Sequence, residues 1–491
     1  MSHWFDAFGQ VHRFNLVSPT RVLYNSRHTC DGVLAEIRQT GQLPAGFSFA
    51  QRRDPCQSLF KKFMATFEPR RDLVCGNGGG VKNAAKVNIC VTLSTDYPGI
   101  PSLSSPSLSS PSSAHSKRSD TSPGKAQSRR LYSKTDATVL QELDPETLEP
   151  IGLANQSMLH PELTGACSAA HARTDPVTGD IFNYNLTLGR TCIYKVFQVC
   201  KGSGEATILA TITDAPGAYI HSFFLTERYV VLCVWGAHYG FGGLKVLYHK
   251  NLLDAIDPWD PAKPNIWYVI DRTSARRGVV STHHSEPFFA FHSINAWEDA
   301  EGHIIAEIPA YDNLDILKKF YLKNIKGDST GARAWSERGR PRFTRWKLSP
   351  MANHSEAVKV FQNSKDSSLE LPSINPRFVT RPHRYTYGLL NRVKSTLADG
   401  IVKFDSTSHT WKVWEKHAHT PGECVFVPDP DGTDEDDGVL LSVVLDGFSR
   451  KSYLLCLNAR DLSEIARAEM DTAVGFGFHG KHVGSVDSVE Y

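Results

Sequence analysis

The sequence of 491 residues lacks the features of a membrane-spanning, secreted or nucleic-acid-binding protein. No apolar run reaches the roughly 18 residues that a helix needs to span a bilayer. The first residues, MSHWFDAFGQ, have no apolar core and do not predict a signal peptide. The formal net charge is only +2, so nothing in the charge balance indicates nucleic acid as a partner.

The ten cysteines contain no CxxC pair, and the spacing of Cys192 and Cys200 suits no common zinc site. We therefore expect unpaired thiols and a cytoplasmic protein. The sequence leaves open whether this protein also makes peripheral contact with membranes.

Long helical periodicity is scarce, apart from short stretches such as NLLDAI at Asn251 and LDILKKFY at Leu314. Residues 97–130 are dominated by serine, proline and basic residues. Such a segment buries too little apolar surface to offset the entropy of ordering it. We predict one β-propeller domain over residues 1–491, with a disordered Ser/Pro-rich loop insertion at 97–130.

Seven segments share one pattern, in which a β-rich run, a short polar turn and a second β-rich run follow one another. Their turns hold Asp, Asn, Ser, Pro or Gly, as in β-hairpins. Repeated hairpins predict an all-β, seven-bladed β-propeller with short helices over its axial face, each blade ending in an outer hairpin. The hairpins begin at Val11, Val139, Tyr194, Trp267, Arg345, Ile401 and Leu454.

A histidine or glutamate follows five of these hairpins at a nearly fixed distance. In a propeller, the strand after an outer hairpin is the innermost strand of the next blade, so these residues are expected on one ring around the axis. They are His221, His292, Glu370, Glu423 and His479. His171 follows its hairpin at a greater distance, and His292 falls in EPFFAFHSINAWED, which predicts a short buried strand.

Four imidazoles converging on an axis can bind a divalent first-row metal. The two glutamates can accept the outer N–H of a ligating imidazole and fix its tautomer. The alternative is a set of unrelated core histidines, each with one hydrogen bond. The acidic stretch DPDGTDEDDG from Asp429 lacks the terminal Glu of a calcium loop, so a solvated loop is favoured there.

At these residues the sequence resembles the carotenoid cleavage oxygenases, a family that includes stilbene-cleaving enzymes and retinoid isomerases, and it looks like a fungal-type member with a short N-terminus. The matching stretches include HWFDAFGQVHRF, DPETLEP, SAAHARTDPVTGDIFNYN, IHSFFLTERYVVL, FFAFHSINAWED, LELPSIN and GFHG. The resemblance implies a seven-bladed propeller that holds Fe(II) through His171, His221, His292 and His479.

The family's carboxylates that hold the histidine N–H groups fall on Glu370, Glu423 and Asp136, where Asp136 replaces the usual glutamate and is expected to reach its histidine less well or through water. The reaction implied is cleavage of a carbon–carbon double bond of a carotenoid or apocarotenoid by O2, with no catalytic residue beyond the iron centre. Candidate walls of the substrate tunnel are Phe291, Trp235, Tyr239 and Phe478.

Two other functions stay open, namely cleavage of a stilbene or phenylpropenoid and a non-catalytic propeller with a degenerate metal site. Stilbene-cleaving members tend to have lysine where this chain has Thr135, although Lys134 is one place away. The family usually carries further strands ahead of the WFD segment. We therefore expect an incomplete closing blade here, with an unpaired edge near His479, and leave open whether this short N-terminus is native.

Overall fold

The computed structural model describes residues 1–43, 48–50, 84–103, 129–249, 251–273, 278–327, 330–351 and 354–484. Strands account for most of the regular structure, and the helices are few and short. Among the described residues, no helix combines the length and the apolar character needed to cross a bilayer.

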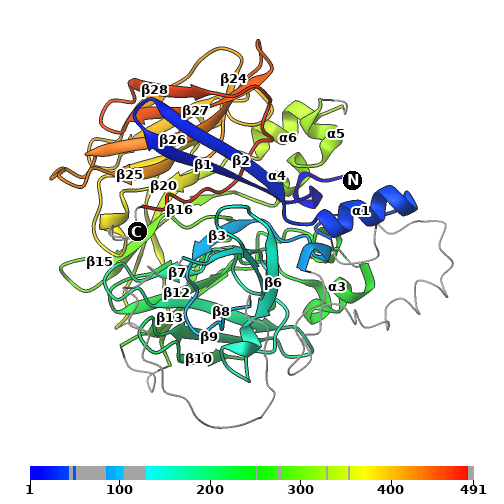
Figure 1. Cartoon of the computed structure of the whole chain (residues 1–491). Coiled ribbons are helices and arrows are strands. Elements are labelled where there is room, and N and C mark those ends of the chain that lie inside the picture. The colour runs from blue at the N-terminus through cyan, green and yellow to red at the C-terminus, as the bar shows by residue number, and fades with distance from the viewer. Residues whose placement is uncertain are drawn as a thin grey trace, which may run out of the picture.

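Six sheets of four or five strands follow one another along the chain (Figure 1). The first three are β3 (Thr92–Thr95), β4 (Leu131–Lys134), β5 (Val139–Leu143) and β6 (Pro150–Asn155); β7 (Arg173–Thr174), β8 (Ile181–Thr187), β9 (Ile193–Val199) and β10 (Ala206–Ile212); and β11 (Phe224–Leu225), β12 (Tyr229–Val234), β13 (Asn265–Asp271), β14 (Val279–Ser285) and β18 (Ser355–Glu356).

The other three sheets complete the propeller. They are β15 (Asn295–Glu298), β16 (Ile304–Ala310), β17 (Arg342–Leu348) and β19 (Val358–Gln362); β20 (Glu370–Ser373), β21 (Tyr385–Leu390), β22 (Gly400–Asp405) and β23 (Thr410–Trp414); and β24 (His419–Pro421), β25 (Val425–Pro428), β26 (Gly438–Asp446), β27 (Lys451–Asn458) and β28 (Glu464–Glu469).

All seven predicted hairpins are present, but the predicted number of blades is wrong. Six hairpins close blades, whereas β1 (Gln10–Ser18) and β2 (Arg21–His28) pair only with each other among the described residues. The described residues therefore form six blades and a separate two-stranded sheet. Turn chemistry identifies a hairpin, but it does not specify which sheet the hairpin joins. Among the described residues, the sheet that ends at β28 has five strands, so the expected incomplete blade beside His479 is not found there.

The middle strands of the blades form the core because neighbouring blades cover both of their faces. Every residue of β12 and β16 is buried, whereas the outer strands β19 and β28 are largely exposed. Large side chains such as Trp235, Trp267 and Trp346 lie fully inside. This packing gives the axial segments between blades a rigid support.

The short helices gather on one side of the molecule, near the N-terminus (Figure 1). They are α1 (Asp31–Thr40), α3 (Leu244–His249), α4 (Asp315–Lys319), α5 (Leu322–Ile325) and α6 (Ala332–Arg338). The helix predicted at Leu314 is confirmed as α4, whereas the stretch at Asn251 forms only the 3-10 helix η5 (Leu253–Ala255). The other 3-10 helices are η1 (Trp4–Asp6), η2 (Ala84–Lys86), η3 (Gln156–Met158), η4 (Gly240–Gly243), η6 (Lys365–Ser367) and η7 (Pro376–Phe378).

The predicted insertion at 97–130 lies largely outside the described residues, so it stays a prediction over 104–128. At its start, Tyr97 and Ile100 are 1% and 2% exposed and pack in a core cluster with Tyr132 and Phe197. Its first residues therefore belong to the folded domain.

Candidate metal centre

The four candidate histidines lie in segments between blades rather than inside strands. His171, His221 and His292 precede β7, β11 and β15, the strands that begin three successive sheets, and His479 follows β28. The prediction that His292 sits within a strand is therefore wrong. Its segment makes only an isolated bridge, from Phe289 to Tyr311, before β15 begins at Asn295.

The four imidazoles nevertheless converge on one point. One ring nitrogen from each of His171, His221, His292 and His479 lies within 4.8 Å of the others. Ring centroids are separated by 4.3 Å for His171 and His479 and by 6.1 Å for His221 and His479. The Nε2 atoms of His171 and His479 lie 3.1 Å apart. A single ion can be reached by four nitrogens at such separations.

A carboxylate holds the outer nitrogen of three of these rings. The Nδ1 atom of His221 lies 2.7 Å from Oδ1 of Asp136. The corresponding distances are 2.6 Å from His292 to Glu370 and 3.0 Å from His479 to Glu423. An ionised carboxylate only accepts hydrogen bonds, so each Nδ1 carries the proton and each Nε2 keeps its lone pair. The structure shows no carboxylate partner for His171 within the described ranges.

Asp136 reaches His221 directly, so the expectation of a poorer or water-mediated contact is wrong. The N–H of Ser168 donates to the Asp136 carbonyl at 2.9 Å, which ties this segment to the one that carries His171. The carboxylate of Asp136 lies within direct hydrogen-bonding distance of His221 despite its shorter side chain.

His292 provides the test of whether these residues suit a metal. Its Nε2 atom is buried and meets no hydrogen-bond partner in the described part of the chain. A buried polar atom without a partner is costly unless something binds it. Four neutral nitrogen donors suit a divalent first-row ion, so the donor set fits the metal that the sequence predicts.

The environment favours the neutral form of His171 and His292 and the charged form of Glu370. Burial lowers the pKa of His171 well below its usual range, and the neighbouring histidines add to this effect. Burial also lowers the pKa of His292. Burial alone would raise the pKa of Glu370, but its electrostatic interaction with the His292 ring and the hydrogen bonds from His292, Leu371 and Tyr311 outweigh it and lower the pKa. Neutral imidazoles are the form that ligates metals.

Two tyrosines that the sequence analysis missed complete the carboxylate network. The hydroxyl of Tyr219 donates to Asp136 at 3.0 Å, and that of Tyr311 donates to Glu370 at 2.9 Å. The third carboxylate instead accepts the backbone N–H of Gly480 at 2.7 Å. Tyr219 stands two residues before His221, which is a weak signal, but nothing in the sequence indicates that Tyr311 faces Glu370.

A cavity of about 4590 Å³ opens onto the histidines, and His221, His292 and His479 line it. Aromatic rings form much of its wall near this point, with ring centroids 5.8 Å apart for Phe5 and Phe291 and 5.4 Å apart for Phe5 and Phe478. Tyr239 also lines the cavity. Trp235 does not, because it is fully buried and its indole N–H donates to the carbonyl of Tyr219.

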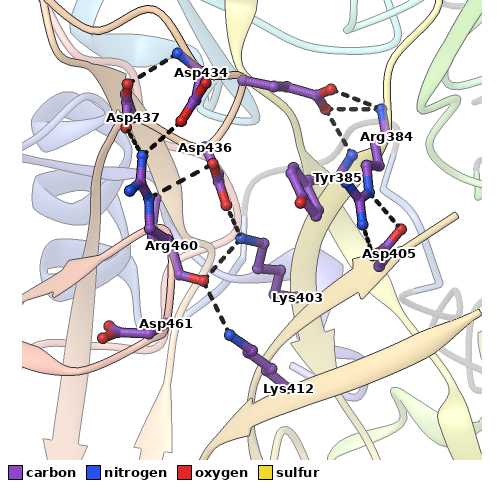
Figure 2. Close-up of polar contacts among 12 residues, drawn as sticks. Arg384, Tyr385, Lys403, Asp405, Lys412, Asp434, Asp436, Asp437, Arg460 and Asp461 are labelled. Carbon is purple, nitrogen blue, oxygen red and sulfur yellow. Dashed lines mark hydrogen bonds and ion pairs between the residues drawn. The ribbon is translucent and has the colours of Figure 1, made fainter. Parts of the chain in front are cut away.

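The acidic stretch from Asp429 forms an ion network between two blades rather than a cation site (Figure 2). The guanidinium of Arg460 contacts Asp434 at 2.9 Å and Asp437 at 2.5 Å. The ammonium of Lys403, from the neighbouring blade, lies 2.5 Å from Asp436. These cations neutralise the carboxylates that a calcium ion would need.

Comparison with known proteins gives the same fold and points to one family. A family model described as RPE65, retinal pigment epithelial membrane protein, matches residues 1–484. A carotenoid dioxygenase of Neurospora crassa is 37% identical and aligns with 99% of this chain and 83% of its own length. A torulene dioxygenase of Gibberella fujikuroi is 36% identical and aligns with 98% of this chain and 84% of its own length.

Among solved structures, the cobalt-substituted apocarotenoid oxygenase of Synechocystis matches with a TM-score of 0.72 at 21% identity. The match covers 98% of this chain and 88% of that structure. At this level of identity the likeness concerns the fold.

Proposed function

Because this chain belongs to the carotenoid cleavage oxygenase family, we propose that it is a non-haem Fe(II) dioxygenase. It cleaves a carbon–carbon double bond of a carotenoid or apocarotenoid with O2 and releases two carbonyl products. The observation that carries the proposal is the convergence of four imidazoles, three of them held by a carboxylate at Nδ1.

His171, His221, His292 and His479 would hold the iron. Iron, when bound, supplies the activation of O2 toward an alkene. Asp136, Glu370 and Glu423 keep the three Nδ1–H tautomers, so each ring presents Nε2 to the centre. The segments between the blades bring the four rings together, and a site whose ligands are held in place by the fold binds its ion with less loss of side-chain freedom.

The walls of the cavity suit a polyene. Aromatic faces such as those of Phe5, Phe291 and Phe478 exclude water and pack against an extended conjugated chain. The cavity suits a phenolic stilbene less well, because it offers no lysine at this position to bind the phenolic oxygen. Thr135 lines the cavity, whereas Lys134 is not among its lining residues. These observations favour the polyene over the stilbene alternative.

An exposed apolar patch supports peripheral contact with a membrane from the cytoplasmic side. Phe241, Leu244 and Tyr248 are 79%, 58% and 57% exposed. Leu244 and the neighbouring Gly242 also line the cavity. An apolar patch at a cavity mouth allows a hydrocarbon substrate to pass from lipid to protein without crossing water. The eight described cysteines are free thiols, as a reducing compartment requires.

The proposal is tested by incubating iron-loaded protein with carotenoids, apocarotenoids and stilbenes in air and identifying the carbonyl products by mass spectrometry. We expect paired polyene aldehydes, and we expect none from the His292→Ala variant. Stilbene-derived aldehydes alone would favour the stilbene alternative. A protein that binds iron at the four histidines but cleaves no member of the panel would be a non-catalytic propeller.

A further inference from the structure

Lys319 is a buried cation in the cavity that the proposed mechanism does not use. It ends α4, whose buried side chains are Ile316, Leu317 and Lys319. Lys319 is 4% exposed and lines the same cavity as His292. Its neighbour Lys318 points outward, with a side chain 52% exposed and an ion pair to Asp315.

The ammonium of Lys319 has no hydrogen bond or ion pair within the described part of the chain. Asp399 is near enough to favour the charged form. The oxygens of Asp399, however, accept the backbone N–H groups of Arg392, Lys394 and Ser395. Burying an ammonium without a direct partner is costly, and such a group in a cavity wall is a candidate for binding a ligand.

A second lysine shows how this fold satisfies a buried ammonium when its role is structural. Lys403 is also 4% exposed. Its ammonium contacts Asp436 at 2.5 Å and the carbonyl of Arg460 at 2.9 Å, and it lies 3.9 Å from the ring centroid of Tyr385 (Figure 2). Lys319 has no equivalent of these contacts among the described residues. Lys134 is likewise buried, at 7% exposed, but neither it nor Lys403 lines the cavity, so the position in the cavity wall distinguishes Lys319 from both.

Apolar rings line the same cavity as Lys319. Phe320, the next residue, lines the cavity with Phe5 and Phe291, and its ring centroid is 5.1 Å from that of Phe5 and 6.4 Å from that of Phe291. A single cation in such a wall cannot hold a hydrocarbon, but it can bind an oxygen at the end of one. A few polar groups in an apolar pocket typically fix the orientation of the ligand.

We propose that Lys319 binds the terminal oxygen of an oxygenated polyene, the carboxylate or aldehyde of an apocarotenoid. This inference rests on the proposed function and deepens it. The contact defines the substrate class as polyenes with one oxygenated end, in preference to pure hydrocarbon carotenes. By holding that end, Lys319 sets which double bond reaches the histidines, and it acts as a specificity residue that takes no part in the chemistry.

The test measures binding directly, so that it does not depend on turnover. Three polyenes of equal chain length, ending in a carboxylate, an aldehyde and a methyl group, are titrated into the full chain, and tryptophan quenching gives each Kd. We expect the carboxylate to bind best. Lys319→Met should weaken binding of the carboxylate-ended polyene by about 10- to 100-fold, as expected for the loss of a charged hydrogen bond. Binding of the aldehyde-ended polyene should be weakened less. Methyl-ended polyene should bind equally to both proteins.

Lys318→Met is the matched control and should leave all three dissociation constants unchanged. Lys319→Arg should restore part of the carboxylate affinity, because it restores the charge. An unchanged carboxylate affinity in Lys319→Met, an equal loss for the methyl-ended polyene, or a wild-type chain that binds none of the three would overturn the inference. Carboxylate binding through Lys319 without any cleavage would instead refute the proposed function and leave the binding role intact.

Discussion

The Nδ1 atom of His292 lies 2.6 Å from Oε2 of Glu370, and the other oxygen of that carboxylate accepts the hydroxyl of Tyr311 at 2.9 Å. The Nε2 atom of the same imidazole has no partner in the described ranges. This chain of contacts fixes one tautomer and directs the lone pair inward. We therefore expect Glu370 and Tyr311 to affect the affinity for a metal although neither would contact the ion.

We expect Glu370→Gln to keep the fold and to lower iron affinity by about 10- to 100-fold. An amide is neutral, and it can present its NH2 group to Nδ1 instead of an oxygen, so the inward tautomer loses its support. Metal titration into the apo protein measures the effect. Glu205→Gln, at an exposed position, is the control and should bind iron as the wild type does. Equal iron affinities in the two variants would show that Glu370 only provides hydrogen bonds within the protein core and does not support metal binding.

Tyr311→Phe should lower iron affinity by a smaller factor than Glu370→Gln, because it removes one hydrogen bond to the carboxylate and leaves the charge. Tyr311 acts only through Glu370, so a double-mutant cycle should show strong coupling. Additive effects on iron affinity would contradict this order of contacts.

The hairpins and the ring of histidines were predictable because both depend on local sequence. Turn residues define each hairpin, and His221, His292 and His479 follow their hairpins at a nearly constant distance and converge in the structure. The count of blades was not predictable in this way, since the β1–β2 hairpin has the same turn chemistry as the others. Pairing of a hairpin edge depends on residues far away in the chain.

The contacts behind the histidines were only partly predictable. Glu370 and Glu423 share the fixed spacing, and both reach a histidine. Tyr311 and Lys319 belong to segments without any such regularity, and their positions follow from how α4 and its neighbours pack over the axis. The contact of Tyr311 is seen only from the 2.9 Å distance between its hydroxyl and Glu370. The proposal for Lys319 depends on the lack of a partner for its ammonium among the described residues.

Exposed side chains near η4 and α3 lead to a prediction about membranes. Phe241 has a φ of 51°, a left-handed conformation that is unfavourable for an aromatic residue, while its ring is 79% exposed. Replacing Phe241 and Leu244 by serine should reduce binding to lipid vesicles at least about tenfold, because each buried apolar side chain contributes roughly 1.5–3 kcal/mol.

Vesicle sedimentation measures this binding. Val177→Ser is the matched control, since Val177 is 76% exposed in the turn between β7 and β8. Equal sedimentation of the double variant and the control would exclude this patch as the membrane contact.

Lys319→Met is expected to stabilise the protein at neutral pH. Burial lowers the pKa of Lys319 to about 8, although Asp399 partly opposes this shift. Below pH 8 both the folded and the unfolded chain carry the proton, so the full penalty of the buried charge applies. Between pH 8 and the usual lysine value of about 10.4, the unfolded chain binds more protons, and the stability of the wild type rises with pH.

Lys319→Met should therefore raise the free energy of unfolding at pH 7 by on the order of 2–3 kcal/mol, and the gain should shrink as the pH rises above 8. Denaturant titrations of wild type and variant at pH 7 and pH 9.5 measure both quantities. Lys318→Met, whose ammonium is exposed in the folded protein, should show neither the gain nor its pH dependence. A Lys319→Met protein less stable than the wild type would mean that the ammonium has a stabilising partner. Burial of the ammonium would then carry no net free-energy cost, and the argument for a ligand at this position would fail.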